Sequence, residues 1–509
     1  MVYLVCIRII RMFFMRRIFH IFIGLLCLAG VMPAAIAEAP PEWAIERIDN
    51  HLTRSVEHGF SGAVLIADGN KIILKKGYGD ANRAAKTPIT TATLFDIGSV
   101  TKQFTAAAIM LLEKDGKLSV DDTLARYFPT VPEDKQRITV HQLLTHSSGL
   151  PGGVGIDDFT HIDTDKFFTR VMKMELLSKP GETYHYSNVG YSLLARIIEL
   201  SANQSYETFL QERLFQPADM QHTGYLQSKK KDGEAALGYR AGVVEIPSTL
   251  SRYQADQKIA WSLKGNGGLI SSLDDMYNWY LALRNHVILD KEQVERLTTG
   301  YISQNVDNAD IKYGYGWSVF ASPKDTKMVG HNGSNGIYYF DLRWLQEEDL
   351  AIIYASNAMV QGTPSISENI ELMLFDNVFN PPSFAAGPVT EVLRFAASFT
   401  GTPANLKQRV KTQFEAQTQE RYVLNRAGLA LLEVDQPERA IALLSLNVEL
   451  FENDGNLWDS LGEAYLAANQ LDDAKRCFVN ALVMAPDTRC YWCDNSKAKL
   501  TTIKNQMRR

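Results

Sequence analysis

The sequence predicts a mixed α/β domain followed by an all-helical C-terminal quarter. Apolar residues recur at helical spacing over 103–112 and 193–200, whereas the run Ile-Tyr-Tyr-Phe over 337–340 is typical of a strand. A third pattern, a 34-residue repeat that aligns position 424 with 458, occupies the end of the chain. At 509 residues the chain is too long for one typical domain, and an apolar content of 46 % is ample for a core.

The first helix that indicates chemistry is the one predicted after Gly98. It places Ser99 at the helix start and Lys102 three residues on, so that the hydroxyl and the amine lie one turn apart on the same face. A serine hydroxyl is a weak nucleophile that needs a nearby base. A backbone N–H at a helix start can also stabilise a developing oxyanion. The apolar run that follows predicts a helix that stops near Gly116.

The spacing S-x-x-K by itself is not specific, because it occurs twice more, at Ser228 and at Ser496. Both of these stretches are rich in lysine and polar residues, which is typical of solvated surface. The apolar context of Ser99, together with the motifs that follow, favours Ser99 as the functional serine.

The second motif is Tyr186-Ser187-Asn188, on a loop between a Lys-Pro-Gly turn at 179–181 and the apolar helical run over 193–200. A rigid scaffold presents reactive side chains at such loop tips. A phenol with a lowered pKa can shuttle protons, and a neighbouring amide can hold a substrate carbonyl. The structural alternative is a capping asparagine beside a packed aromatic ring.

The third motif is His331-Asn332-Gly333-Ser334, which lies between two strand-like runs. It places a residue that can carry positive charge two positions before a glycine, and glycine lets a substrate backbone approach a strand edge closely. A similar triplet begins at His222, but it follows a helix end and a turn, so we interpret it as surface structure.

Taken in this order, the three motifs resemble the serine penicillin-recognising hydrolases. The closest match is the branch that holds class C β-lactamases, D-alanyl-D-alanine carboxypeptidases, D-aminopeptidases and related esterases. Three further stretches support the resemblance: Leu-Leu-Thr-His-Ser-Ser-Gly-Leu-Pro at 143–151, Pro-Gly-Glu-Thr-Tyr at 180–184 and Tyr-Gly-Tyr-Gly-Trp at 313–317. The resemblance covers residues 42–380. It implies a β-lactamase/transpeptidase-like fold, in which an antiparallel sheet packs against helices and a helical subdomain, with the site between them.

The resemblance also implies the catalytic roles. Ser99 attacks a carbonyl and forms an acyl-enzyme, while Lys102 and Tyr186 share the proton transfers. The backbone N–H groups of Ser99 and Ser334 form the oxyanion hole. His331 completes the catalytic set, and the resemblance implies no cofactor and no metal.

Substrate binding is assigned by resemblance to Asn188, Asn332 and Gly333. His331 stands where β-lactamases carry lysine, although some carboxypeptidases and aminopeptidases of the family carry histidine there. Histidine is mostly neutral near neutral pH, so it binds a carboxylate less firmly than lysine does. We therefore do not expect strong β-lactamase activity, and we expect the preference for carboxylate substrates to rise as the pH falls through the histidine range.

The N-terminus is typical of a secretory signal. Basic residues precede an apolar run over 18–32, and Ala35-Ile36-Ala37 is an A-x-A cleavage site. Residues 1–37 are therefore predicted to be a signal peptide, which implies a periplasmic or secreted protein. The alternative is an uncleaved anchor in the inner membrane. The net charge of −6, with no basic cluster beyond the N-terminus, argues against a nucleic-acid partner.

The C-terminal quarter resembles tetratricopeptide repeats. The second copy matches that pattern at eight positions, and the first copy matches it more weakly. The eight positions are Trp458, Leu461, Gly462, Tyr465, Ala474, Phe478, Ala481 and Pro486. We expect a linker and helix over 381–420, repeats over 421–490 and a capping helix over 491–509. Such repeats suit a protein partner rather than catalysis.

Three cysteines remain after cleavage of the signal: Cys477, Cys490 and Cys493. The spacing of the last two is C-x-x-C, but no βαβ pattern surrounds it and no histidine follows His331, so a redox or zinc role is disfavoured. A structural disulfide is expected in an oxidising compartment, and the sequence leaves its pairing open.

The sequence as a whole predicts a secreted serine hydrolase that acts through an acyl-enzyme on D-amino-acid peptides, amides or esters. The alternative is a penicillin-type sensor that is acylated without turnover and binds a partner through its repeats. The expected ligands are a small-molecule or peptide substrate and a protein partner at the repeats.

Overall fold

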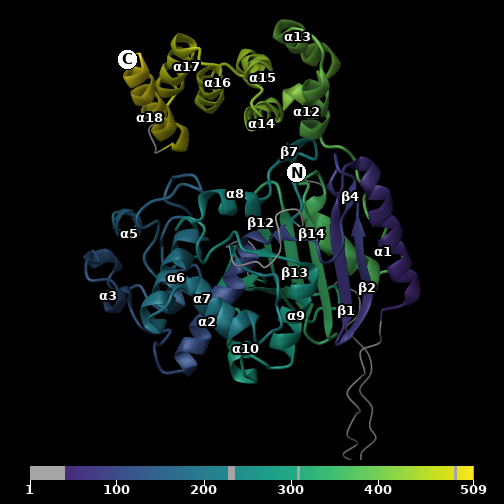
Figure 1. The fold of residues 1–509 in the computed structure, drawn as a ribbon, viewed down its shortest axis with the longest axis vertical. Helices are drawn as coiled ribbons and strands as arrows, with labels where there is room; N and C mark the ends of the chain where they lie inside the picture. Colours follow the sequence, from purple (N-terminus) through teal and green to yellow (C-terminus); the bar gives the residue numbers. More distant parts are fainter. Residues whose placement is uncertain (1–39, 227–234, 306–309, 487–489, 508–509) are drawn as a thin grey trace, which may run out of the picture. The chain divides into compact units, whose positions relative to one another are not determined.

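The computed structural model describes residues 40–226, 235–305, 310–486 and 490–507. Its centre is an eight-stranded, fully antiparallel sheet in the order β2-β1-β14-β13-β12-β11-β10-β9 (Figure 1). The strands are β1 (Gly62–Asp68), β2 (Lys71–Tyr78), β9 (Ile302–Ser303), β10 (Lys312–Tyr313), β11 (Ser318–Ala321), β12 (Lys327–Ser334), β13 (Tyr339–Leu345) and β14 (Leu350–Ser356). The fold is therefore the antiparallel sheet with helices that the resemblance implied.

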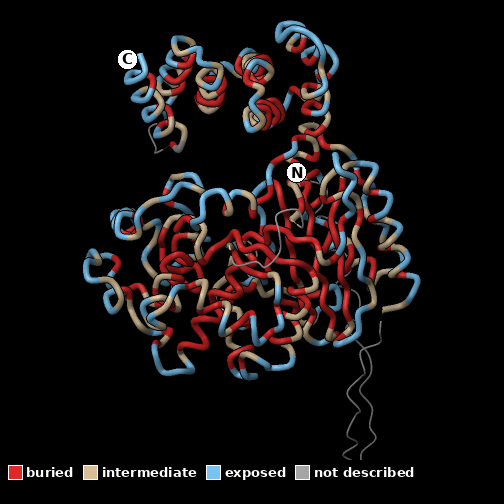
Figure 2. Tube along the Cα trace, in the orientation of Figure 1, coloured by how far each residue is buried: buried red, intermediate tan, exposed pale blue. Residues whose placement is uncertain are grey.

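Strands β1 and β14 are almost entirely apolar, because both faces of the sheet are covered there. On β1, Leu65 belongs to one buried cluster while Val64 and Ile66 belong to another, as the two-residue period of a strand requires. Helices α1 (Glu42–Ser55) and α11 (Ile366–Phe375) cover the Val64 side. Figure 2 shows the buried positions gathered in these strands and in the helices beside them.

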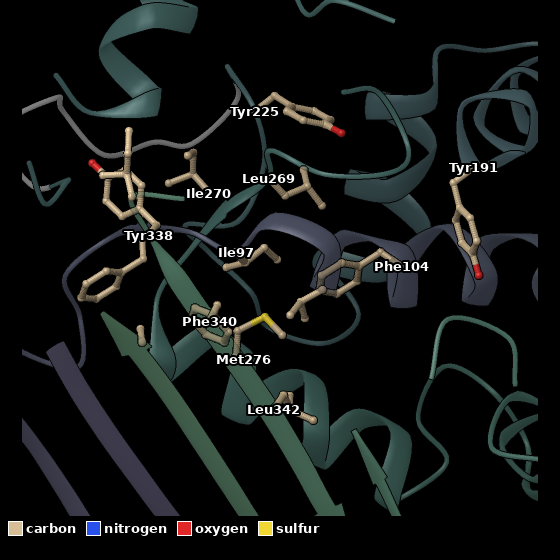
Figure 3. Close-up of a cluster of buried hydrophobic side chains, with 14 of the residues drawn as sticks. Ile97, Phe104, Tyr191, Tyr225, Leu269, Ile270, Met276, Tyr338, Phe340 and Leu342 are labelled. Carbon is tan, nitrogen blue, oxygen red and sulfur yellow. The ribbon is translucent and has the colours of Figure 1, made fainter. Parts of the chain in front are cut away.

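The opposite face of the sheet packs against a helical region that contains α2 (Thr101–Lys114). All twelve residues from 101 to 112 are buried, so α2 is a core helix and even its polar side chains point into the protein. Figure 3 shows Ile97 and Phe104, at the start of this segment, packed beside Leu269 and Phe340. This apolar contact fixes the chain on both sides of Ser99.

The domain contains eight further α-helices and three small sheets among its described residues. The other helices are α3 (Leu124–Tyr127), α4 (Val140–Leu144), α5 (Thr164–Met172), α6 (Asn188–Ala202), α7 (Tyr206–Leu210), α8 (Thr249–Asp256), α9 (Leu273–Arg284) and α10 (Lys291–Leu297). Three two-stranded sheets pair β3 (Asp80–Asn82) with β4 (Thr87–Pro88), β5 (Phe95–Asp96) with β8 (Ile270–Ser271), and β6 (Gly238–Arg240) with β7 (Val244–Ile246).

The C-terminal region is helical. Its helices are α12 (Pro388–Ser398), α13 (Pro403–Gln413), α14 (Arg421–Leu432), α15 (Pro437–Leu450), α16 (Gly455–Ala467), α17 (Leu471–Val483) and α18 (Tyr491–Gln506). The same contact recurs 34 residues apart. A Cβ at Gly428 would lie 2.5 Å from Leu444, and one at Gly462 would lie 2.7 Å from Phe478. A glycine therefore lets the helices approach each other in both the α14/α15 and the α16/α17 pair.

Two sequence-based expectations for this region are settled by its contacts. The disulfide joins Cys490 to Cys493 at the start of α18, and Cys477 is a buried free thiol. The prediction that Ser496 lies on solvated surface is wrong. Ser496 is fully buried and donates a hydrogen bond to Asp459, because α18 packs against α16.

The predicted signal peptide and Ser228 lie outside the described residues. In the part of the chain that the structure describes, no helix combines the length and the apolar character that crossing a bilayer requires.

Candidate active site

Ser99 lies in a single 3₁₀ turn, Gly98–Val100, that leads directly into α2. The α-helix therefore begins two residues later than the sequence predicts. Gly98 has a φ of +49°, in the left-handed region that glycine adopts without strain. This turn leaves Ser99 half-buried, while the residues on either side of it are buried.

Lys102 points from the first turn of α2 toward Ser99. Its Nζ lies 3.1 Å from Ser99 Oγ, 2.8 Å from Asn188 Oδ1 and 2.7 Å from the carbonyl oxygen of Asn266. The side chain is fully buried, and no described carboxylate lies within ion-pair distance of it. Burial lowers the pKa of the Lys102 amine well below its ordinary value of 10.5. A neutral amine can accept the Ser99 proton, as a nucleophilic serine requires.

Tyr186 approaches the same pair from the loop before α6. The Lys102 Nζ lies 4.6 Å from the centre of the Tyr186 ring, and the Ser99 side chain acts to lower the pKa of the phenol. Although 36 % of the residue's surface is exposed, burial around the hydroxyl raises its pKa above the ordinary value of 10. The sequence analysis considered a phenol with a lowered pKa. The structure instead holds a neutral phenol, which can donate a proton.

Asn188 is the first residue of α6, and the helix is capped by Ser187, whose Oγ accepts the N–H of Gly190 at 3.1 Å. The capping role thus falls to the serine, which leaves the Asn188 amide free to contact Lys102.

The strand β12 touches the Ser99 turn without any side chain between them. A Cβ on Gly333 would lie 2.0 Å from the carbonyl oxygen of Ile97 and 2.6 Å from the Ser99 nitrogen. A Cβ on Gly98 would lie 2.7 Å from the Ser334 nitrogen. Only glycine fits on either side, and the backbone N–H groups of Ser99 and Ser334 are brought close together as a result. Two such donors can stabilise one developing oxyanion.

A buried carboxylate, which the sequence analysis missed, holds these two segments in register. Asp96 Oδ1 accepts the Gly98 N–H at 2.8 Å, while Oδ2 accepts from Asn335 Nδ2 at 3.0 Å and from Thr249 Oγ1 at 2.9 Å. Asp96 therefore bridges the Ser99 turn to the residue after Ser334. A lone aspartate before a glycine carries no sequence signal for this role.

His331 is buried on β12, with both ring nitrogens occupied. Nδ1 lies 2.7 Å from the carbonyl oxygen of Asn332, which can only accept, so Nδ1 carries a proton. Burial, with the nearby Lys102, lowers the pKa of His331 to about 3. The ring is therefore neutral, and its Nε2 accepts the Tyr313 hydroxyl proton at 2.8 Å. The expectation that His331 titrates in the ordinary histidine range is wrong, because burial of the ring and the nearby Lys102 both disfavour its protonated form.

The Asn332 side chain does not lie beside Ser99, Lys102 and His331. Its side chain lies on the other face of β12, where Nδ2 donates to the Tyr339 hydroxyl at 3.2 Å. The alternation of side chains along a strand places His331 and Gly333 toward Ser99 and Asn332 away from it.

His146 belongs to the stretch at 143–151 that supported the family resemblance, and it packs against the loop that carries Tyr186 and Ser187. It is fully buried with a φ of +57°, and its Nδ1 accepts the Ser187 N–H at 3.0 Å. Its ring lies 4.3 Å from that of Tyr186. The residue thus fixes both the backbone and the ring of the Tyr186 motif.

One carboxylate faces this group from a nearby loop. Asp158 interacts electrostatically with both Lys102 and Asp96, and its charge opposes the lowering of the Lys102 pKa. Across the described ranges, no three His, Cys, Asp or Glu side chains are grouped so that they could hold a metal ion.

Comparison with known proteins shows which family the sequence matches. Residues 48–374, well over half of the chain, match the Beta-lactamase family. Penicillin-binding protein 4* of Bacillus subtilis (strain 168) is 28 % identical over 418 residues, which cover 78 % of this chain and 91 % of that protein.

Solved structures agree with this match. The octameric penicillin-binding protein homologue from Pyrococcus abyssi is 27 % identical, with a TM-score of 0.57 that covers 70 % of this chain and 82 % of that chain. The D-amino acid amidase from Ochrobactrum anthropi SV3, solved with D-phenylalanine, is 20 % identical with a TM-score of 0.56, covering 66 % of this chain and all of that chain, and it shows a shared fold alone. The chain belongs to the beta-lactamase family.

Proposed function

We propose that the protein is a serine hydrolase that acts through an acyl-enzyme. The observation that carries this proposal is the contact between Ser99 Oγ and the Lys102 amine. This amine is buried, has a lowered pKa and pairs with no carboxylate of the described residues. A neutral amine at 3.1 Å is within the reach that a general base needs.

In the proposed first half-reaction, Lys102 Nζ takes the Ser99 proton as Oγ bonds to the substrate carbonyl carbon. The carbonyl oxygen becomes an oxyanion between the N–H groups of Ser99 and Ser334. The bond to the leaving amine or alkoxide then breaks. Tyr186 donates its proton to the leaving group and regains one from Lys102, so the proton balance is kept.

In the second half-reaction, water attacks the acyl-enzyme and the same groups act in reverse. A water proton passes to the Tyr186 and Lys102 pair, and Ser99 Oγ is released as a protonated hydroxyl.

The substrate class is proposed from the charges around this group. His331 is neutral with both ring nitrogens engaged, so it offers no positive charge to a substrate carboxylate. Asp158 is close enough to Lys102 for its charge to act on the amine. These features favour neutral or amine-bearing D-amino-acid peptides, amides and esters over β-lactams, which carry a carboxylate. The named amidase activity of a structural neighbour is compatible with this class.

A sensor that is acylated without turnover is the second candidate, because proteins named penicillin-binding proteins match the chain. We also propose that the protein is exported. The C-terminal disulfide supports this, since such bonds persist in oxidising compartments.

Hydrolysis measurements with matched substrates test the proposal. Wild type and Ser99→Ala are assayed on a p-nitrophenyl ester, a D-amino-acid amide, a D-Ala-D-Ala peptide and nitrocefin. We expect turnover of the ester and the amide by wild type alone. A single stoichiometric burst without turnover would favour the sensor, and equal activity of Ser99→Ala would overturn both candidates.

A further inference from the structure

The segment that carries the Ser334 N–H is held mainly by polar contacts. Residues 334–336 are all exposed, so apolar packing contributes little to their position. Asn335 bonds to Asp96 on one side of this segment, and the carbonyl oxygen of Gly336 accepts from Arg240 Nη1 at 3.0 Å on the other. We call residues 334–336 the oxyanion loop. Ser334 is the last residue of β12 and pairs with Tyr339 of β13, whereas Asn335 and Gly336, beyond the strand end, are held by these two anchors.

The Arg240 anchor is built into a short hairpin that packs on the loop. A Cβ at Gly238 of β6 would lie 2.3 Å from the Ile337 side chain, so the strand lies directly on the residue after the loop. Two residues later, the Arg240 guanidinium lies so close that a Cβ at Gly336 would be 2.8 Å from Nη1. The backbone thus positions Arg240 against the loop.

The other donors of Arg240 bind a residue of the C-terminal helices. Nε donates to Glu433 Oε2 at 2.9 Å, and Nη2 donates to Glu433 Oε1 at 2.7 Å. This is the two-pronged geometry in which a guanidinium orients a carboxylate. One guanidinium therefore bonds to the oxyanion loop and to Glu433 at the same time.

Glu433 occupies a position where a carboxylate needs a partner. It is the C-cap residue of α14, at the end of the helix where carbonyl groups gather and negative charge is disfavoured. Arg240 offsets that repulsion. Without Glu433, the bond to Gly336 is the one that Arg240 keeps among the described residues, and its partly exposed side chain gains freedom to turn into solvent.

We propose that Glu433 and Arg240 are positioning residues for the oxyanion hole, so that the C-terminal helices set the rate of acylation. This inference rests on the proposed function. Glu433 acts only through Arg240, and Arg240 acts only through the Gly336 carbonyl. Loss of an entire oxyanion donor costs about 10²- to 10³-fold in rate. Loosening one donor should therefore cost less, about 3- to 10-fold.

The competing interpretation is an exposed ion pair without a kinetic role, since most such pairs contribute little. The chain offers a matched control. Glu449, on α15 of the same helical region, pairs with Lys407 on the surface. Glu449→Gln removes an ion pair of the same kind that makes no contact with the oxyanion loop.

The test uses the full-length protein and a fluorophosphonate probe, which phosphonylates the nucleophilic serine with loss of fluoride. The phosphonylation rate constant, which stands in for acylation, and the melting temperature are measured for each variant. We expect Glu433→Gln to lower the rate about 3- to 10-fold and Glu449→Gln to leave it within about twofold. For ester hydrolysis, kcat should fall while KM stays constant, because the donor acts on the transition state. Glu433→Asp should restore part of the rate.

A double variant decides whether the two residues act in series. Arg240→Gln together with Glu433→Gln should react no more slowly than Arg240→Gln alone. Multiplicative effects, or a Glu433→Gln rate equal to that of wild type, would overturn the inference. If the wild-type protein does not react with the fluorophosphonate, both the proposed function and this inference are wrong. A reactive wild type with unaffected variants overturns the inference alone.

Discussion

The motif S-x-x-K occurs on two helices of the described chain, and the two sites differ in every respect except spacing. At Ser99, the lysine amine points at the serine hydroxyl and has no carboxylate partner within ion-pair distance. At Ser496, the serine is bonded to Asp459, and the Nζ of Lys499 pairs with Glu463 at 2.9 Å. The first arrangement places an amine with a lowered pKa beside a hydroxyl. At the second site, the hydroxyl of Ser496 and the amine of Lys499 are each bound to a carboxylate and serve a structural role.

The difference teaches that burial without a counter-charge, rather than sequence spacing, activates the pair. An amine paired with a carboxylate keeps its proton, whereas an amine that is buried alone loses it more readily. Each prediction below changes one side of this comparison.

The largest expected effect comes from the serines themselves. Ser99→Ala should lower turnover of a small ester by at least about 10³-fold, because the covalent route is lost. Ser496→Ala should leave turnover within about twofold, since its hydroxyl binds only Asp459. Steady-state kinetics of the two variants provide the measurement. Comparable losses in both would contradict the distinction.

Substitution of the two lysines should affect turnover just as unequally as substitution of the two serines. Lys102→Gln should lower turnover about 10²-fold or more through loss of the base. Lys499→Gln serves as the matched control, and its kcat should stay close to that of wild type. Circular dichroism melts check that both variants are folded. A Lys102→Gln enzyme with near-normal kcat would rule out a base role for that amine.

A substitution at His331 tests whether the charge at this position affects substrate preference. His331→Lys should raise activity on carboxylate substrates relative to neutral amides on the order of tenfold, because it introduces a cation where the wild type has a neutral ring. The ratio of kcat/KM for a matched pair of substrates is the measurement. An equal response of both substrates would show that position 331 does not contact the carboxylate.

The pH dependence should distinguish Lys102 from His331. Acylation needs the neutral Lys102 amine, so the rate is retained above the lowered Lys102 pKa and falls as the pH drops through it. His331, with a pKa of about 3, stays neutral throughout the ordinary histidine range. The substrate-charge preference should therefore change by less than about twofold between about pH 5.5 and 8. A preference that rises steeply near pH 6.5 would restore the expectation derived from the sequence.

The smallest effect is on stability. Ser496→Ala leaves the buried carboxylate of Asp459 with one donor fewer, which should lower the free energy of unfolding by about 1–3 kcal/mol. A urea or thermal melt of the variant measures this loss, and an unchanged midpoint would show that the bond contributes nothing net.

Sequence reasoning reached the parts of the site that short-range patterns encode. The relative placement of Ser99 and Lys102 follows from helical spacing, whereas the pairing of the Ser99 and Ser334 N–H groups came from the family resemblance. The glycines at 98 and 333 that allow this approach were recognised only in the structure. The antiparallel sheet came from the family resemblance rather than from periodicity, since the strands β1 and β14 are apolar on both faces.

Features of the site that depend on tertiary contacts could not be predicted from the sequence. Asp96 and Asn266 contribute through partners far along the chain, and no local pattern marks them. His146 lies in a stretch that supported the family resemblance, but its contact with Ser187 could not be read from the sequence. The neutral state of His331 depends on the depth of its burial, and the burial of Ser496 depends on how α18 packs on α16. A polar composition alone suggests solvent exposure in such cases.

Mapping the covalent adduct tests the central claim most directly. The full-length protein is labelled with a fluorophosphonate, digested and sequenced by mass spectrometry. We predict one adduct per chain, on Ser99, which Lys102→Gln slows strongly and Lys499→Gln does not. An adduct on Ser496 or Ser228, or labelling of Ser99 at the wild-type rate in Lys102→Gln, would contradict the account.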